Sequence, residues 1–302
     1  MQTRHLAILS YITVCIVWGS TYLFIKIGVT DMPFLLFAGI RFTAAGLIML
    51  AVSRFRRWPF PATFSDYKTH IFAGFMLLFI SNGLICWAEQ WIDSGLTSLL
   101  VASIPLFIGL IETLFPSEQR ISPLSWAGLI VGFGGVAALV GPHFDFTQKE
   151  FLAMLAALAA ALNWAMASVY LKRRTVSGAM LPGVGVQMLT AGLVFMVVAP
   201  IFGEFSLRQA SWSGYGALLY LIFFGSILAY SAFNYMLKAM PATKAGTYAY
   251  VNPVVAVLLG VLVLQEEITG QNIIAAAIIL LGVLLVQLSK TPPAEKAVSE
   301  PQ

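Results

Sequence analysis

Long apolar stretches fill most of the chain, and short polar connections separate them. Ten of these stretches approach the ~20 residues that a helix needs to cross ~30 Å of hydrocarbon. They cover residues 7–28, 33–53, 70–90, 95–115, 122–141, 150–171, 181–202, 213–236, 244–264 and 270–289. The sequence has no series of ~10-residue segments with alternating apolar and polar positions, the pattern of an outer-membrane barrel. It therefore predicts an all-α polytopic membrane protein with ten transmembrane helices.

Composition agrees with this pattern. The chain of 302 residues is 59% hydrophobic and 10% charged, with a mean hydropathy of +0.88, whereas soluble domains carry about 25% charged residues. The first apolar stretch is too long for the core of a signal peptide and lacks a small-x-small cleavage site, so we expect it to stay as a membrane anchor. Cys15 and Cys86 both lie in apolar stretches, where packing thiols are expected and a disulfide framework is not.

A weak internal repeat relates the two halves of the chain. Matching residues lie 146 positions apart early in each half and 148 apart later: Trp18 and Trp164, Lys26 and Lys172, Gly46 and Gly192, then Pro105 and Pro253, Glu118 and Glu266, Gly134 and Gly282. Each half holds five apolar stretches, and an odd number turns the second copy upside down relative to the first. The predicted units are residues 1–143 and an inverted 144–290, an arrangement typical of transporters.

Lysine and arginine predict the orientation, because positively charged loops stay in the cytoplasm. With a cytoplasmic N-terminus, the inner loops hold Arg4, Arg54, Arg56, Arg57, Lys68, Arg120, Lys172, Arg173, Arg174, Lys238, Lys244, Lys290 and Lys296. The outer loops hold only Lys149 and Arg208. We therefore expect both termini in the cytoplasm, with residues 291–302 as a disordered tail. The net charge of +4 comes from these loops, so it indicates a lipid bilayer as partner and no nucleic acid.

Three segments carry a family resemblance. They are WGSTYLFIKIG at 18–28, AEQWIDSGL at 88–96 running into LLVASIP at 99–105, and YAYVNPV at 248–254 followed by Glu266 and Glu267. Together they resemble EamA-type transporters of the drug/metabolite transporter superfamily over residues 7–289. The resemblance implies two inverted five-helix repeats in the bacterial cytoplasmic (inner) membrane, and usually export of amino acids, related metabolites or toxic compounds. It does not fix the substrate.

Ionisable side chains at bilayer depth are functional candidates, because placing one there costs at least ~2.5–3.5 kcal/mol. Arg41 lies eight residues into the second stretch, ~12 Å below its outer end at 1.5 Å per residue. Lys26 and Glu89 share the outer depth, so we interpret them as an outer-gate ion pair or a handle for a zwitterionic substrate. The alternatives are a snorkelling Lys26 and a static contact of Arg41 with backbone carbonyls. We interpret Glu112 as an interfacial residue, with a coupling acid as the alternative.

Uncharged polar and aromatic side chains gather near the predicted midplane. Pro105 and Pro253 interrupt the fourth and ninth stretches at related positions, and a proline frees backbone carbonyls. In a bilayer such a break is tolerated beside neighbouring helices or a polar cavity. We therefore predict a central substrate cavity lined by Trp18, Tyr22, Asn82, Ser103, Asn163, Trp164, Tyr230, Asn234, Tyr250 and Asn252. The alternative for the aromatic members is ordinary packing or an interface belt.

The first stretch also lacks a feature of some relatives. The small four-helix members of the superfamily use a glutamate there for exchange of protons and drug, and here Thr13, Val14 and Cys15 fill that region. Facilitated diffusion, or coupling through another group, fits the residues better. Gly128 and Gly132 form a small-xxx-small step, which either packs the fifth stretch against the tenth or makes a homodimer contact. We expect a monomer, with a homodimer as the alternative.

The sequence contains few motifs that are typical of other functional classes. It contains no phosphate-binding G-x-x-x-x-G-K-[ST] loop, no H-E-x-x-H, and no soluble domain in its longest loop. We predict a transporter that exports aromatic or hydrophobic amino acids, or related compounds, by alternating access, without a cofactor or metal and without enzyme activity. A multidrug or toxic-compound exporter of the same fold is the alternative. A nucleotide-sugar carrier would favour more cationic residues than Arg41 alone, and a membrane receptor or sensor is the rival of a different class.

Overall fold

A computed structural model describes residues 2–115, 121–140, 146–204, 210–264 and 270–289. Every regular element in these ranges is a helix. The first half contains α1 (Gln2–Asp31), α2 (Phe34–Phe55), α3 (Phe64–Ala73), η1 (Gly74–Ser81), α4 (Asn82–Ala88), α5 (Ser94–Val101), α6 (Ile104–Leu114) and α7 (Pro123–Val140). The second half contains α8 (Gln148–Lys172), α9 (Met180–Ile201), α10 (Trp212–Tyr220), η2 (Leu221–Leu228), α11 (Ala229–Ala239), α12 (Ala242–Gly246), α13 (Tyr248–Leu264) and α14 (Gly270–Leu288).

Each predicted stretch contains helix, and the helices make a polytopic membrane protein. Seven are long and apolar enough to cross a bilayer: Arg4–Asp31, Phe34–Phe55, Phe64–Ala88, Ser94–Leu114, Gln148–Lys172, Met180–Ile201 and Trp212–Ala239. Two shorter apolar helices cover Pro123–Ala138 and Ile273–Leu288. The stretch predicted at 244–264 holds α12 and α13. The predicted tail, together with Glu118, Arg120, Arg208, Glu266, Glu267, Lys290 and Lys296, lies outside the described residues.

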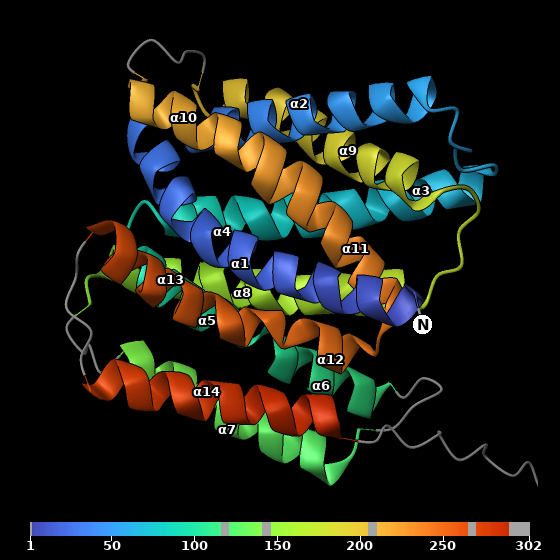
Figure 1. Cartoon of the computed structure of the whole chain (residues 1–302). Coiled ribbons are helices and arrows are strands. Elements are labelled where there is room, and N and C mark those ends of the chain that lie inside the picture. The colour runs from blue at the N-terminus through green and yellow to red at the C-terminus, as the bar shows by residue number, and fades with distance from the viewer. Residues whose placement is uncertain (1, 116–120, 141–145, 205–209, 265–269, 290–302) are drawn as a thin grey trace, which may run out of the picture.

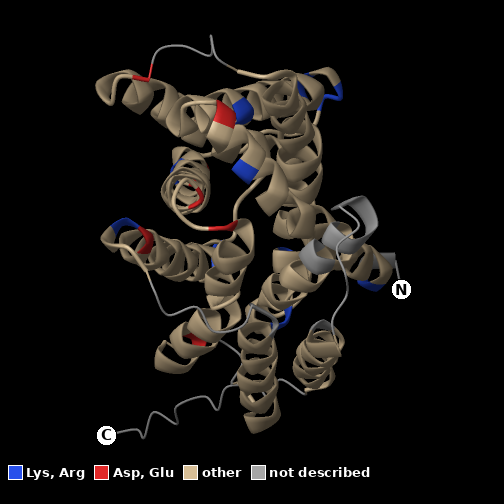
Figure 2. Ribbon diagram, turned by 90° about the vertical axis from the view of Figure 1, so that its left-hand side faces the viewer, with Lys and Arg blue, Asp and Glu red and all other residues tan. Residues whose placement is uncertain are grey.

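The bundle is layered, and matching helices pack in pairs. In Figure 1, α2 and α9 lie together at the top, α7 and α14 lie together at the bottom, and α1, α8 and α13 fill the middle. The start of α1 and the end of α14 lie at the same end of the bundle. Seen along the helices in Figure 2, charged residues are sparse on a mostly tan ribbon.

Repeated glycines make the close packing of α2 on α9 possible. A Cβ added to Gly46 would lie 2.5 Å from the amide nitrogen of Leu189, and one added to Gly192 would lie 2.3 Å from that of Thr43. Thr43 and Leu189 are themselves 146 positions apart, so the two contacts are reciprocal. In this way the two main chains approach closely without a side chain between them.

The small-xxx-small step packs α7 against α14. A Cβ on Gly282 would lie 2.4 Å from the Gly132 amide nitrogen and 2.7 Å from the Gly128 carbonyl oxygen. Of the two alternatives for this step, the contact within one chain is the one observed.

Two π-helical segments interrupt otherwise α-helical spans, and the sequence analysis missed both. η1 joins α3 to α4, and η2 joins α10 to α11. The segments have equal length and begin 147 residues apart, at Gly74 and Leu221. A π-helical turn breaks the regular backbone ladder and is frequent at functional sites.

The two prolines act differently, which corrects the prediction that both break their helices. Pro105 stands in the first turn of α6, directly after the break at Ala102 and Ser103. There its missing N–H costs nothing, because the first amides of a helix have no partner within the helix. Pro253 lies inside α13, and the break in the ninth stretch falls at Thr247 instead. The helix therefore continues through Asn252 and Pro253.

Candidate functional site

A central cavity of about 620 Å³ lies among helices of both halves. Aromatic residues form much of its wall: Trp18, Tyr22, Phe42, Trp164, Tyr230 and Tyr248. Its polar members are Thr21, Arg41, Asn82 and Asn252, and aliphatic side chains together with Gly225 complete the lining. Its lining resembles that of small-molecule sites, which are mostly apolar with a few placed polar groups.

The structure brings six of the ten predicted cavity residues together there, and Arg41 joins them. The six are Trp18, Tyr22, Asn82, Trp164, Tyr230 and Asn252. Asn252 is buried on α13, and with its amide turned to satisfy its neighbours it donates to the carbonyls of Tyr248 and Cys15 at 3.1 and 3.3 Å. It therefore ties α13 to α1 beside the cavity.

Four predicted residues lie elsewhere. The Ser103 hydroxyl donates to the Leu100 carbonyl (2.6 Å) at the break before α6. Tyr250 donates to the Leu129 carbonyl (2.7 Å) and packs with α7 and α14. It lies two residues from both Tyr248 and Asn252, and residues two apart on a helix do not share a face.

Asn163 and Asn234 are the other two. Asn163 is adjacent to the cavity residue Trp164, so it points to a different side of α8. Its amide nitrogen donates to the Met76 carbonyl (2.6 Å) and to the Ser81 hydroxyl (2.7 Å). Both partners belong to η1, so Asn163 fixes the π-helical segment and does not line the cavity. Asn234 lines a second cavity, described below.

Sequence reasoning missed several lining residues. Tyr248 lies one turn before Asn252, so helical spacing could have found it. Ile25 extends the stripe of Trp18 and Tyr22 on α1 by one more turn in the same way. Gly225 had no sequence signal, since it enters the wall through η2.

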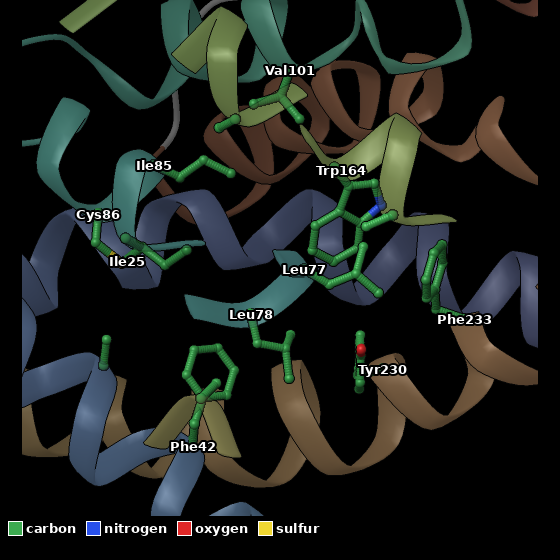
Figure 3. Packing of buried hydrophobic residues seen from close by; sticks show 14 of the residues in the cluster. Ile25, Phe42, Leu77, Leu78, Ile85, Cys86, Val101, Trp164, Tyr230 and Phe233 are labelled. Atoms are coloured by element: carbon green, nitrogen blue, oxygen red, sulfur yellow. The ribbon is translucent and has the colours of Figure 1, made fainter. Parts of the chain in front are cut away.

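The aromatic wall is a set of rings in direct contact. The Trp18 and Trp164 ring centroids are 5.4 Å apart, nearly perpendicular at 81°. Phe233 packs against both, at 5.2 and 5.3 Å, and Figure 3 shows Trp164, Tyr230 and Phe233 around the same space. Trp18 Nε1 donates to the Gly225 carbonyl of η2 (3.0 Å). Trp164 Nε1 has no hydrogen-bond partner among the described residues, so it leaves a donor available beside the cavity.

Arg41 brings a positive charge to this apolar wall. The residue is 4% exposed, and its Nε donates to the Ser226 hydroxyl of η2 (2.9 Å). Its guanidinium lies 4.7 Å from the centre of the Phe42 ring. Nη1 has no hydrogen-bond partner in the described part of the chain. A buried cation with an unsatisfied donor is costly, and the buried carboxylate of Glu89 is a charge of opposite sign that acts on it.

Lys26 reaches Glu89, but the predicted ion pair is not formed. Its ammonium donates to the main-chain carbonyls of Glu89 (2.6 Å) and Ile92 (3.1 Å). Both carboxylate oxygens of Glu89 are buried without a hydrogen-bond partner among the described residues. The reason for the difference is the turn that follows α4, whose carbonyls point at the ammonium and have no partner within a helix. Lys26 therefore holds the turn at the end of α4.

The repeat mate of Lys26 does the same on α11. Lys172 donates to the Leu237 carbonyl (2.8 Å), and Leu237 lies 148 positions after Glu89. Glu112, predicted near the inner boundary, has a carboxylate oxygen 3.5 Å from Arg173 Nη2.

A second cavity, of about 430 Å³, lies where α9 begins and α8 and α11 end, beside the last turn of α3. Its polar lining residues are His70, Lys172, Arg174, Asn234 and Lys238. His70 is 5% exposed, and its Nδ1 lies 3.0 Å from Gln187 Nε2. Within the ranges that the structure describes, no three His, Cys, Asp or Glu residues gather as metal ligands do.

Comparison with known proteins agrees with this picture of the fold. The model of the EamA-like transporter family matches the chain twice, at residues 5–141 and 151–288. The chain is 37% identical over 276 residues to the "Uncharacterized inner membrane transporter YedA" of Escherichia coli K12, covering 91% of this chain and 88% of that protein. A solved structure titled "Crystal structure of protein" is similar in fold, with a TM-score of 0.76 at 22% identity, over 93% of this chain and 97% of that one.

More distant relatives are also named as transporters. The chain is 26% identical to the "Uncharacterized transporter YoaV" of Bacillus subtilis 168, over 92% of this chain and 95% of that protein. It is 24% identical to the "Probable amino-acid metabolite efflux pump" of Escherichia coli K12, over 90% of this chain and 91% of that protein.

Proposed function

The chain belongs to the EamA-like transporter family and is a multi-pass transporter of the inner membrane, and on that premise we propose that it exports amino acids with aromatic or apolar side chains, or related metabolites. The substrate occupies the central cavity, and the two halves of the protein rock around it to open the cavity to one side and then to the other. No cofactor takes part in this mechanism.

The observation that carries the proposal is the pairing of Arg41 with an aromatic wall. The free Nη1 of Arg41 offers a hydrogen bond and a charge to a carboxylate. The rings of Trp18, Trp164 and Tyr248 offer flat apolar surfaces to the side chain. Trp164 Nε1 is a second free donor for the same carboxylate. One relative is named a probable amino-acid metabolite efflux pump, which supports this substrate class.

Ten spans in two inverted repeats provide the architecture of the proposal. The pairs that recur at the repeat distance support it: η1 with η2, Gly46 with Gly192, and Lys26 with Lys172. The two matches of the family model support it as well. The start of α1 and the end of α14 lie at one end of the bundle, which supports the proposal that both termini share one side of the membrane, and the charge distribution supports the cytoplasm as that side.

The test is export by the purified protein from proteoliposomes preloaded with tryptophan. We expect release down the gradient, with Arg41→Gln and Trp164→Ala each raising the KM for tryptophan. Arg54→Gln is the matched control, because Arg54 is an exposed cation on the same helix as Arg41. If the unmodified protein releases no amino acid under any gradient, the proposal fails. Release of cationic drugs in place of amino acids would favour the multidrug alternative.

A further inference from the structure

Three buried side chains on three helices form a continuous hydrogen-bonded relay. His70 lies on α3, Gln187 on α9 and Tyr230 on α11, with exposed fractions of 5%, 1% and 1%. Gln187 Nε2 lies 3.0 Å from His70 Nδ1, and the Tyr230 hydroxyl donates to Gln187 Oε1 at 2.5 Å. His70 lines the second cavity and Tyr230 lines the central one. The relay therefore connects the two cavities.

The position of Gln187 in the sequence is informative as well. It lies 146 positions after Arg41, so the two are repeat mates that differ in charge. Both belong to the closely packed pair α2 and α9. Arg41 makes its side-chain contact with η2, whereas Gln187 joins His70 to Tyr230.

The Gln187 amide allows two hydrogen-bonding patterns, and only in the first does its Nε2 also donate to Asn234 Oδ1 (3.4 Å). In the first, a neutral His70 accepts at Nδ1 from Gln187 Nε2, and Tyr230 donates to Gln187 Oε1. If Nδ1 carries a proton, it donates to Oε1 after the amide has turned over, and Nε2 then donates to the Tyr230 oxygen. The Tyr230 hydroxyl proton is now free to turn toward the central cavity. Histidine suits such a switch, because its unperturbed pKa of ~6.5 lies within the physiological range.

We propose that His70 is a proton-binding site and that its protonation turns the Tyr230 hydroxyl into a donor for the substrate carboxylate, beside Arg41. The proton comes from water in the second cavity and stays on the imidazole, while Tyr230 keeps its own proton and only changes its direction. This inference rests on the proposed function for the nature of the substrate. It gives the protein a coupling group in place of the carboxylate that α1 lacks.

Burial of His70 opposes its protonation, and the charged groups that face the ring modify this effect. Lys172, Arg174 and Lys238 line the same cavity and oppose a further positive charge. Asp66, one turn earlier on α3, favours it. From α9 the contact is uncharged: a Cβ on Gly183 would lie 2.3 Å from His70 Cε1, so this glycine leaves room for the ring. The carboxylate of a substrate that enters the second cavity partly offsets the three cations, and its arrival therefore favours protonation of His70.

The test measures the KM for tryptophan export while pH is varied on the side where the second cavity lies. Because a hydrogen bond to a charged group contributes ~1.5–3 kcal/mol, we expect KM to fall by about tenfold or more as His70 becomes protonated. His70→Gln and Tyr230→Phe should both give a KM that no longer depends on pH in this way. His5→Gln is the matched control and should keep the profile of the unmodified protein. A Tyr230→Phe variant with an unchanged pH profile would overturn the proposal.

A second measurement keeps this inference separate from the proposed function. The chain has three histidines, so ¹⁵N-histidine NMR of the purified protein, with His70→Gln for assignment, follows the titration of this ring without any substrate. Tyr230→Phe and Gln187→Leu should each move the titration midpoint of His70. If neither variant moves it, the relay carries no coupling, whatever the protein transports. If the midpoint moves but no amino acid is exported, the switch stands and only the substrate class fails.

Discussion

The contact between α7 and α14 provides a stability test with a control built into the repeat. Gly134 and Gly282 are repeat mates, yet their surroundings differ. A Cβ on Gly282 would lie 2.4 and 2.5 Å from the amide nitrogen and Cα of Gly132, and 2.7 Å from the carbonyl oxygen of Gly128. A Cβ on Gly134 would have nothing within 4 Å. Alanine at the two positions therefore probes close packing at one site and open space at the other.

The magnitude follows from these distances. Carbon contacts are optimal at about 3.5–4.0 Å, so Gly282→Ala forces α7 and α14 apart by about 1 Å. The atoms in the way are main chain, and no change of side-chain rotamer can relieve the clash. Overpacking of this kind costs about 1–3 kcal/mol. The gain in helix propensity on replacing glycine with alanine, ~0.8–1.0 kcal/mol, is common to both variants and cancels in their comparison.

The assay is thermal unfolding of both variants and the unmodified protein in the same detergent. We expect Gly282→Ala to be less stable than Gly134→Ala by about 1–3 kcal/mol, and Gly134→Ala to match or exceed the unmodified protein. Equal melting temperatures for the two variants would refute the close approach of α7 and α14 at Gly282. If both variants lost the same amount of stability relative to the unmodified protein, glycine would be needed at these positions for a reason other than packing between the helices.

Two further predictions concern polar contacts. Lys26→Met and Lys172→Met each leave main-chain carbonyls unbonded, so we expect both to lower the free energy of unfolding. The loss should be about 1 kcal/mol for Lys172→Met and more for Lys26→Met, whose ammonium makes two bonds; an unchanged melting temperature for both would contradict this role. Asn163→Leu removes the donor that satisfies the Met76 carbonyl and the Ser81 hydroxyl of η1, and should destabilise the protein by about 1–3 kcal/mol without a direct effect on the KM for tryptophan. A large KM change in a stable Asn163→Leu protein would place this residue in the cavity after all.

The helical architecture could be predicted because in a bilayer the requirement is simple. Every backbone polar group must be bonded within its own segment, so a long apolar stretch implies a helix, and each predicted stretch contains one. The cavity was partly predictable from the depth of polar and aromatic residues within the predicted stretches. Trp18, Asn82, Trp164 and Asn252 lie at mid-depth in their stretches, and all four line the cavity.

Depth alone does not say which way a side chain points, and this is where the predictions failed. Tyr250 and Asn163 have the same depth as true lining residues but occupy other faces of their helices. The segments η1 and η2 contain neither proline nor any run of polar residues. Their local sequence therefore gave no signal that predicts a π-helix. At Pro253 the sequence predicted a break in the helix where none exists, because α13 continues through this residue.

The places where the repeat holds and the places where it fails have different physical roles. An alternating transporter needs two states within a few kcal/mol of each other, since a larger gap would trap it in one of them. Matched pairs suit that need in the proposed inverted repeat, because Gly46 with Gly192 and Lys26 with Lys172 make corresponding contacts in the two halves. A substrate has no such symmetry and needs partners of fixed chemistry in both states. In the mechanism that we propose, the mismatched pair of Arg41 and Gln187 provides the charge and, through Tyr230, a further donor. Changes at the matched pairs should therefore shift the balance between the two states, whereas changes at Arg41 or Gln187 should alter which molecule is carried.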